Sequence, residues 1–315
     1  MSEDVSIETS SCFFMKIVYP LLLSVFIFIE CAFPQSPYYV PGNSYWGKNH
    51  FVEYVAGNLP VIISVPHGGS LKPEIISDRT FGVNARDYGT QEVAREMIAE
   101  FKRRTGKIPH VVFSHLSRKK LDVNREEFEA AQEDPIALTA WSEYHAFIDS
   151  AKAAERSMFK KGILIDLHGQ NNPEGRIEIG YRLENEELMM QDADLNGKMF
   201  VEKSSLKNLV KSSSYSHAEL IRGKASLGAL FDKYALPSTP SPSQPIPGSY
   251  KFYGGGYTIF RHAVEDTTEI FGVQFELNPE LRSQEHTEST ANLFVSVIID
   301  YLNIHYGEKF TERLN

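Results

Sequence analysis

Short, continuous apolar runs recur along the chain and alternate with longer amphipathic stretches. Three of the runs read VIISVPHGG from position 61, ILIDLHGQ from position 163 and FGVQFELNP from position 271. Two others, HVVFSHL at 110–116 and RIEIGYRL at 176–183, have the same character. Runs of this length and composition are typical of buried parallel strands.

Helical periodicity fills the intervals between these strands. An apolar stripe at helical spacing consists of Val93, Ala94, Met97, Ile98 and Phe101. A long helix is predicted at 134–161, with Asp134 as its cap and Pro135 in its first turn. Further helices are predicted near 192–211, 217–234 and 284–304. This alternation predicts one α/β domain over 36–315, a three-layer αβα structure with a mostly parallel mixed sheet.

The N-terminal segment 1–35 has the features of a signal peptide. Lys16 precedes an uncharged apolar run at 17–29, which is too short to cross a bilayer comfortably. Met15, directly before Lys16, is a possible true start. We therefore expect a secreted, extracellular protein, with a buried N-terminal helix and a retained signal anchor as the alternatives.

Cleavage of this segment between positions 32 and 35 would also remove both cysteines, Cys12 and Cys31. The mature chain would then contain no disulfide, and cysteine could not serve as a metal ligand. No stable membrane contact is expected unless the segment is retained.

Composition and charge narrow the classes of partner. The chain has 315 residues, of which 42% are hydrophobic and 23% charged, as in an ordinary globular enzyme. Its formal net charge of −9 argues against a nucleic-acid partner, because the short basic stretch at 117–120 cannot offset it. A small molecule or a peptide is the expected substrate.

Three of the predicted strands end close to a residue that can take part in metal chemistry. His67 and His168, each followed by glycine, end the first two, and Glu276 ends the last. Open α/β sheets place their ligand sites beyond the carboxyl ends of the strands, so these side chains are expected to converge. Imidazole and carboxylate groups with one position left open for water are typical of catalytic zinc.

Several motifs, taken in order, resemble the N-formylglutamate amidohydrolase family. They are PHGG, DYGTQEVARE, SRKKLDVNR, DLHG and FELN, spread over roughly residues 58–305. The resemblance implies a zinc-peptidase-like, phosphorylase/hydrolase-like fold, similar to that of zinc carboxypeptidases and N-acetylmuramoyl-L-alanine amidases. It also implies hydrolysis of an amide-type C–N bond with one zinc ion per chain.

The same resemblance suggests Asp87 as the third metal ligand beside His67 and His168. Asp87 could equally be the cap of the helix that follows, and Glu74 and Asp78 remain alternative ligands. Asp166 lies two residues before His168 in a strand and therefore shares its face. It is a candidate to orient that imidazole or to serve as an ordinary structural hydrogen-bond partner.

The remaining candidates concern the reaction and the substrate. Glu276, a carboxylate at the end of an apolar strand, is the expected general base. By resemblance to the family, Arg118 is expected to stabilise the developing oxyanion, which a guanidinium group can do by donating hydrogen bonds. By resemblance to the family motif, Asn124 and Arg125 bind a substrate carboxylate, and Asp122 is expected to hold the arginines in place.

A glycine-rich segment, GGG at 254–256, follows a stretch rich in serine and proline and is expected to form a lid or a binding loop. Together these features predict a zinc-dependent hydrolase of an amide-type bond in a carboxylate-bearing substrate, such as an N-acyl amino acid or a small peptide. The alternatives are a carboxypeptidase-like enzyme, a peptidoglycan amidase, or a non-catalytic binding protein on the same fold.

Overall fold

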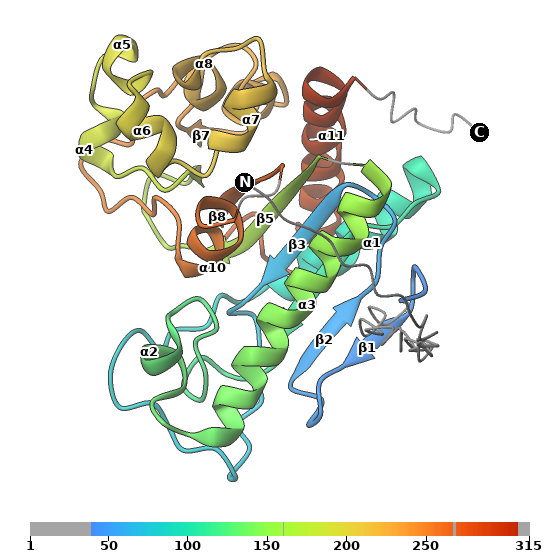
Figure 1. Ribbon diagram of the computed structural model, residues 1–315. Helices are drawn as coiled ribbons and strands as arrows, with labels where there is room; N and C mark the ends of the chain where they lie inside the picture. Colours follow the sequence, from blue (N-terminus) through green and yellow to red (C-terminus); the bar gives the residue numbers. More distant parts are fainter. Residues whose placement is uncertain (1–38, 160, 267–268, 308–315) are drawn as a thin grey trace, which may run out of the picture. The chain divides into compact units, whose positions relative to one another are not determined.

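The computed structural model describes residues 39–159, 161–266 and 269–307. The described residues belong to one compact unit (Figure 1). The predicted signal peptide at 1–35 lies outside the described residues and stays a prediction. Within the described ranges, no helix combines the length and the apolar character needed to span a bilayer.

A mixed sheet of eight strands in the described residues forms the middle layer. The strands are β1 (Ser44–Trp46), β2 (Val52–Val55), β3 (Val61–Val65), β4 (His110–Ser114), β5 (Gly162–Gly169), β6 (Ile177–Gly180), β7 (Ser238–Thr239) and β8 (Ile270–Leu277). Their spatial order is β1-β2-β4-β3-β5-β8-β6-β7. The four central strands β4, β3, β5 and β8 are parallel, whereas β2 and β6 pair antiparallel with this central block. The predicted α/β class and mostly parallel mixed sheet are therefore confirmed.

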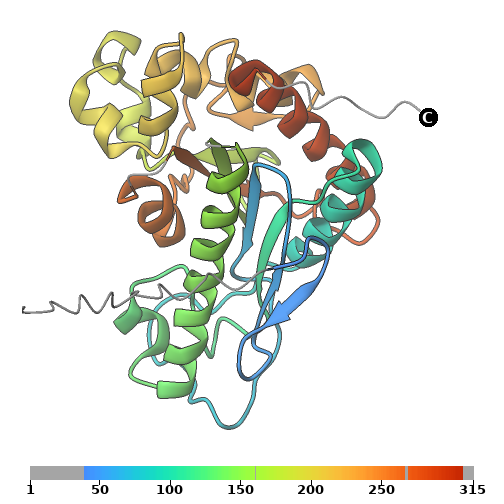
Figure 2. The ribbon, with the colours of Figure 1, turned by 45° about the vertical axis from the view of Figure 1, so that its right-hand side comes forward.

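Helices cover both faces of this sheet. Helix α3 (Pro135–Phe159) lies on one face, and α1 (Thr90–Thr105) and α11 (Thr287–Tyr306) lie on the other (Figure 2). Alternate residues of β3 show why both faces are apolar: Ile62 packs in the cluster with α3, and Ile63 packs in the cluster with α1 and α11. A strand buried on both faces reads as a continuous apolar run, as the sequence does here.

The remaining helices are short, and here two predictions were wrong. The stretch predicted as one helix at 192–211 is three helices, and the stretch at 217–234 is two. They are α5 (Asp192–Leu195), α6 (Lys198–Lys203), α7 (Lys207–Ser212), α8 (His217–Arg222) and α9 (Leu227–Lys233). Extended backbone at Gly197, Ser204 and Gly223 interrupts the helices. The other short elements are α2 (Glu127–Ala131), α4 (Asn185–Leu188), α10 (Tyr257–Ile259) and the π-helix η1 (Phe260–Val264).

The strand order brings the three chemically important strand ends to one edge of the sheet. Strands β3, β5 and β8 are adjacent and parallel, and His168 lies opposite Glu276 in the register of β5 and β8. His67 follows the end of β3 by two residues. The sheet therefore delivers two imidazoles and a carboxylate to the same place, from segments about 100 residues apart in sequence.

Candidate metal centre

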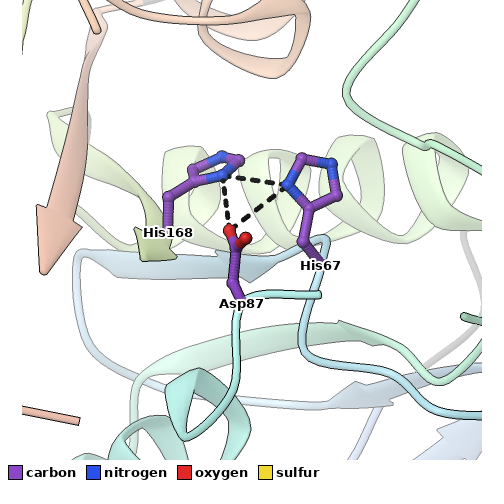
Figure 3. A group of neighbouring side chains, drawn as sticks. All are labelled: His67, Asp87 and His168. Atoms are coloured by element: carbon purple, nitrogen blue, oxygen red, sulfur yellow. Dashed lines mark hydrogen bonds and ion pairs between the residues drawn. The ribbon is translucent and has the colours of Figure 1, made fainter. Parts of the chain in front are cut away.

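Two histidines and one aspartate point three potential ligand atoms at one another (Figure 3). The Nδ1 atoms of His67 and His168 lie 3.1 Å apart. The Oδ2 atom of Asp87 lies 3.4 Å from Nδ1 of His67 and 3.3 Å from Nδ1 of His168. All three side chains are buried.

The outer nitrogen of each imidazole faces a buried carboxylate. Nε2 of His67 lies 2.6 Å from Oδ1 of Asp122, and Nε2 of His168 lies 2.9 Å from Oδ2 of Asp166. A carboxylate accepts hydrogen bonds, so it favours the tautomer with the proton on Nε2. That tautomer leaves the Nδ1 lone pairs directed at the shared centre, as in the carboxylate–histidine–metal arrangement of zinc proteins. The predicted orienting contact of Asp166 is therefore present.

The spacing of the three atoms fits a tetrahedral zinc ion. Zinc binds nitrogen and oxygen at about 2.0–2.1 Å, so tetrahedral ligands lie about 3.3 Å from one another. The observed separations of 3.1, 3.3 and 3.4 Å agree with this value. No rearrangement of the three side chains is needed to bring their donor atoms within reach of one ion.

The negative charge of the buried carboxylates around this cluster also favours binding of a cation. Four carboxylates are buried here: Asp87, Asp122, Asp166 and Glu276. In the described structure the guanidinium groups paired with them are those of Arg118 and Arg79, both on Asp122. Burial disfavours an imidazolium at position 168, but the Asp166 carboxylate outweighs this and raises the pKa of His168 well above its ordinary value. The site attracts positive charge, which a divalent metal would supply.

The carboxylate of Asp87 lies against the two histidines and does not cap helix α1. The cap residue of α1 is Gly89, and the carboxylate of Asp87 instead contacts both histidines and accepts a hydrogen bond from Gly169 N at 3.1 Å. Burial alone would raise the pKa of Asp87, but the contacts with His168 and His67 lower it below its usual range. The suggested cap role is therefore wrong.

The alternative ligands lie elsewhere. Glu74 and Asp78 are exposed, and neither belongs to the cluster of ligand atoms. Asp78 instead forms an ion pair with Lys120, with an O–N distance of 2.8 Å. The structure thus brings together His67, Asp87 and His168 and leaves the other two carboxylates outside.

Glu276 is buried beside this cluster and lines the same cavity, whose volume is about 440 Å³. Burial raises the pKa of the Glu276 carboxyl to about 8, although the positive charge of His168 opposes the rise. Its Oε1 atom accepts a hydrogen bond from Nε2 of Gln274 at 2.9 Å. Gln274 shares the face of Glu276 because it precedes it by two residues in β8.

The predicted substrate residues also line this cavity, but they differ in how many of their hydrogen-bond donors are already used within the protein. Nε of Arg118 donates to Oδ2 of Asp122 at 2.7 Å, and its two terminal nitrogens have no hydrogen-bond partner among the described residues. Arg125 is held by Glu129 and by the carbonyl of Asn124, at 3.0 and 2.8 Å. Asp122 therefore holds Arg118, as predicted, but not Arg125.

Asn124 is mainly engaged with the protein. Its Oδ1 accepts a hydrogen bond from Thr258 N at 2.8 Å, and its Nδ2 lies 3.1 Å from Nε2 of His168. It connects the loop after β4 to the segment that begins α10. Its predicted role in binding a substrate carboxylate stays a prediction.

The glycine-rich segment forms one wall of the cavity and is tied down at several points. Arg182 N donates to Gly254 O at 2.5 Å, and Gly256 N donates to Oε1 of Gln274 at 2.7 Å. A Cβ atom on Gly256 would overlap the amide of Asn124, so this glycine permits a close approach of chains. The contacts fit a binding wall better than the suggested hinged lid.

Three features of the site region were missed in the sequence. The first is the contact of Asp122 with His67, for which the sequence gives no signal. The second is the hydrogen bond from Gln274 to Glu276, for which the only signal is their two-residue spacing in one strand. The third is a buried histidine pair: Nδ1 of His145 lies 2.9 Å from Nε2 of His262, and Nε2 of His145 lies 3.1 Å from Val123 O. His262 does not line the cavity.

No protein-family model matches the chain, and no curated protein matches it. Solved structures with a similar fold include N-formylglutamate amidohydrolase from Ralstonia eutropha JMP134, which is 11% identical with a TM-score of 0.49; the match covers 82% of this chain and 99% of that one. A gene product of Agrobacterium tumefaciens is 16% identical with a TM-score of 0.48, over 80% of this chain and 94% of that one. An N-acetylmuramyl-L-alanine amidase from Mycobacterium abscessus is 12% identical with a TM-score of 0.35, over 79% of this chain and 100% of that one. The Ralstonia protein bears the name of the family that the sequence motifs of this chain resemble.

Proposed function

We propose that this protein is a zinc-dependent hydrolase of an amide-type C–N bond in a carboxylate-bearing substrate, such as an N-acyl amino acid or a small peptide. The observation that carries the proposal is the convergence of His67 Nδ1, His168 Nδ1 and Asp87 Oδ2 within 3.4 Å of one another, in a cavity that also contains Glu276. Three protein ligands and an open cavity are the composition of a catalytic zinc site, whereas structural sites are closed.

Different residues bind the metal, transfer the proton and orient the group that transfers it. Zinc bound by His67, Asp87 and His168 would act as a Lewis acid and would lower the pKa of water. Glu276 accepts a proton from the attacking water and returns it to the leaving amine. The hydrogen bond from Gln274 fixes the orientation of the Glu276 carboxylate for both transfers.

Arg118 and Arg125 interact with negative charge on the substrate. The terminal nitrogens of Arg118 face no protein acceptor in the described residues and are placed to donate to the carbonyl oxygen as it becomes negative. Arg125 lines the same cavity and supplies a cation for the substrate carboxylate. A substrate without a carboxylate loses this second contact.

Metal analysis and a substrate screen test the proposal. The purified full chain should contain about one zinc ion and should hydrolyse at least one N-acyl amino acid or small peptide. Glu276→Gln should keep the zinc and lower kcat by about 100-fold or more, within the range of general acid–base catalysis. Glu186→Gln, which removes an exposed glutamate of α4 outside the cavity, is the matched control. Protein that neither contains nor rebinds zinc, or a Glu276→Gln variant as fast as wild type, would contradict the proposal.

The predicted route to the cell exterior forms a separate part of this proposal. Removal of 1–35 during secretion would leave a mature chain that begins at residue 36. Mass spectrometry of the mature N-terminus decides this, and an intact Met1 or Met15 would refute it.

A further inference from the structure

A second cavity adjoins the one that contains the metal centre. It has a volume of about 460 Å³ and shares four lining residues with the first: Ala85, Arg86, Asn171 and Arg282. The shared residues form a common wall, so a ligand held at the metal centre can continue past them. Lys72 and Lys119 line only the second cavity.

The lining of this second cavity is strongly positive. Its charged side chains are Lys72, Arg86, Lys119 and Arg282, and no carboxylate is among the residues that line it. This contrasts with the formal net charge of −9 for the chain. A concentration of one sign of charge in a cleft raises the local concentration of ligands of the opposite sign.

The two lysines have free ammonium groups. In the part of the chain that the structure describes, neither Lys72 nor Lys119 forms an ion pair within 4.0 Å. The nearby Asp78 pairs with Lys120 and interacts with Lys72 and Lys119 only at longer range. Both lysines are exposed, so their side chains can reach a ligand without loss of a contact within the protein.

The arginines are fixed, which makes the wall rigid. Arg282 is buried and donates to the carbonyls of Tyr88 and Gln170 at 2.8 and 3.1 Å. Arg86 donates from Nε to Gly68 O at 2.7 Å. No carboxylate lines this second cavity, although the charge of Arg282 also interacts with Asp87 and Glu276, which line the first one; Ser70, Ser117 and Asn84 add polar groups around the arginines.

We propose that this second cavity, centred on Lys72 and Lys119, is a subsite for a distal anionic group, so that the natural ligand is a short acidic peptide and not a single N-acyl amino acid. The inference rests on the proposed function for the position of the scissile bond. An anionic group between the two lysines must belong to a part of the ligand that extends beyond Arg86 and Arg282, because these lysines do not line the first cavity.

Two tripeptides that differ only in charge test the subsite. Binding of triglutamate and of triglutamine to the full chain is measured by titration calorimetry, and mass spectrometry follows whether each peptide stays intact. Wild-type protein should bind triglutamate roughly tenfold more tightly than triglutamine. The double variant Lys72→Gln/Lys119→Gln should lose most of this preference, and its fold should be retained because both lysines are exposed.

A double variant with the same change in charge provides the control. Lys48→Gln/Lys198→Gln removes two exposed lysines that line neither cavity and should keep the preference for triglutamate. Absence of the preference in wild type, its persistence in Lys72→Gln/Lys119→Gln, or an equal loss in the control would each overturn the subsite. Whether triglutamate is cleaved bears on the proposed hydrolase activity alone, so the two proposals can fail separately.

Discussion

Glu155 offers a test of the structure that does not depend on any substrate. It lies on α3 with its carboxylate against Gly162, the first residue of β5. The side chain is fully buried, and neither carboxylate oxygen has a hydrogen-bond partner among the described residues. Burial raises the pKa of Glu155 from 4.5 to about 7, since the charged form loses its hydration.

This pKa makes stability depend on pH in a defined direction. The folded protein holds the proton more tightly than the unfolded chain, so the stability contributed by neutral Glu155 is complete below pH 4.5 and is lost as the pH rises through about 7. The full difference is about 3 kcal/mol, because each pKa unit corresponds to about 1.4 kcal/mol. Between about pH 5 and about pH 8 the loss amounts to about 2.5 kcal/mol.

The variant Glu155→Gln removes the ionisation but keeps the size of the side chain. Urea unfolding monitored by fluorescence of Trp46 and Trp141 gives its stability relative to wild type. The variant should gain about 2.5 kcal/mol over wild type between about pH 5 and about pH 8. Glu96→Gln, an exposed glutamate of α1, is the matched control for the change in charge. A difference between Glu155→Gln and wild type that does not change with pH would refute the reasoning.

Other predictions follow from contacts around the metal centre and in the core. Asp166→Asn should weaken zinc binding by about 10- to 100-fold in a chelator competition, because Nε2 of His168 loses its carboxylate hydrogen-bond partner. Unchanged affinity would show that this contact is only structural. Gln274→Met should lower kcat by about fivefold with zinc content unchanged, since Glu276 loses a hydrogen bond worth about 1 kcal/mol. A loss of zinc instead would show that the substitution disturbs the metal centre. Phe275→Ala should lower the free energy of unfolding in urea by about 3–5 kcal/mol, because the side chain of Phe275 is fully buried. Its ring centroid lies 5.4 Å from that of Phe231 and 5.5 Å from that of Phe294. A decrease of less than about 1 kcal/mol would contradict this packing.

Local pattern was enough to predict the fold class and three of the residues at the centre. The strands that lead to His67, His168 and Glu276 are buried on both faces, and such strands leave continuous apolar runs that need no knowledge of the partner strands. The cap of α3 was predicted for a similar reason: Oδ1 of Asp134 accepts hydrogen bonds from Ile136 N and Ala137 N, both at 3.0 Å, within one turn of the chain.

Local pattern failed where the structure depends on less regular segments. The short helices between 192 and 233 carry helical periodicity in sequence, but extended residues such as Gly197 and Gly223 interrupt them. The edge strands β1 and β7, and β2 next to β1, are too short to leave a clear apolar run, and they form because neighbouring strands of the sheet provide their hydrogen-bond partners.

Only the tertiary structure decided which polar groups meet. Asp87 could be a cap or a ligand by sequence, and it is the packing of α1 behind β3 and β5 that brings its carboxylate to His67 and His168. The contact of Asp122 with His67 joins residues 55 positions apart, and the second cavity collects Lys72 and Lys119 beside Arg282. Hydrophobic periodicity records which face of an element is buried, whereas a hydrogen bond between distant segments leaves no periodic trace, because it depends on strand order and on the path of the loops.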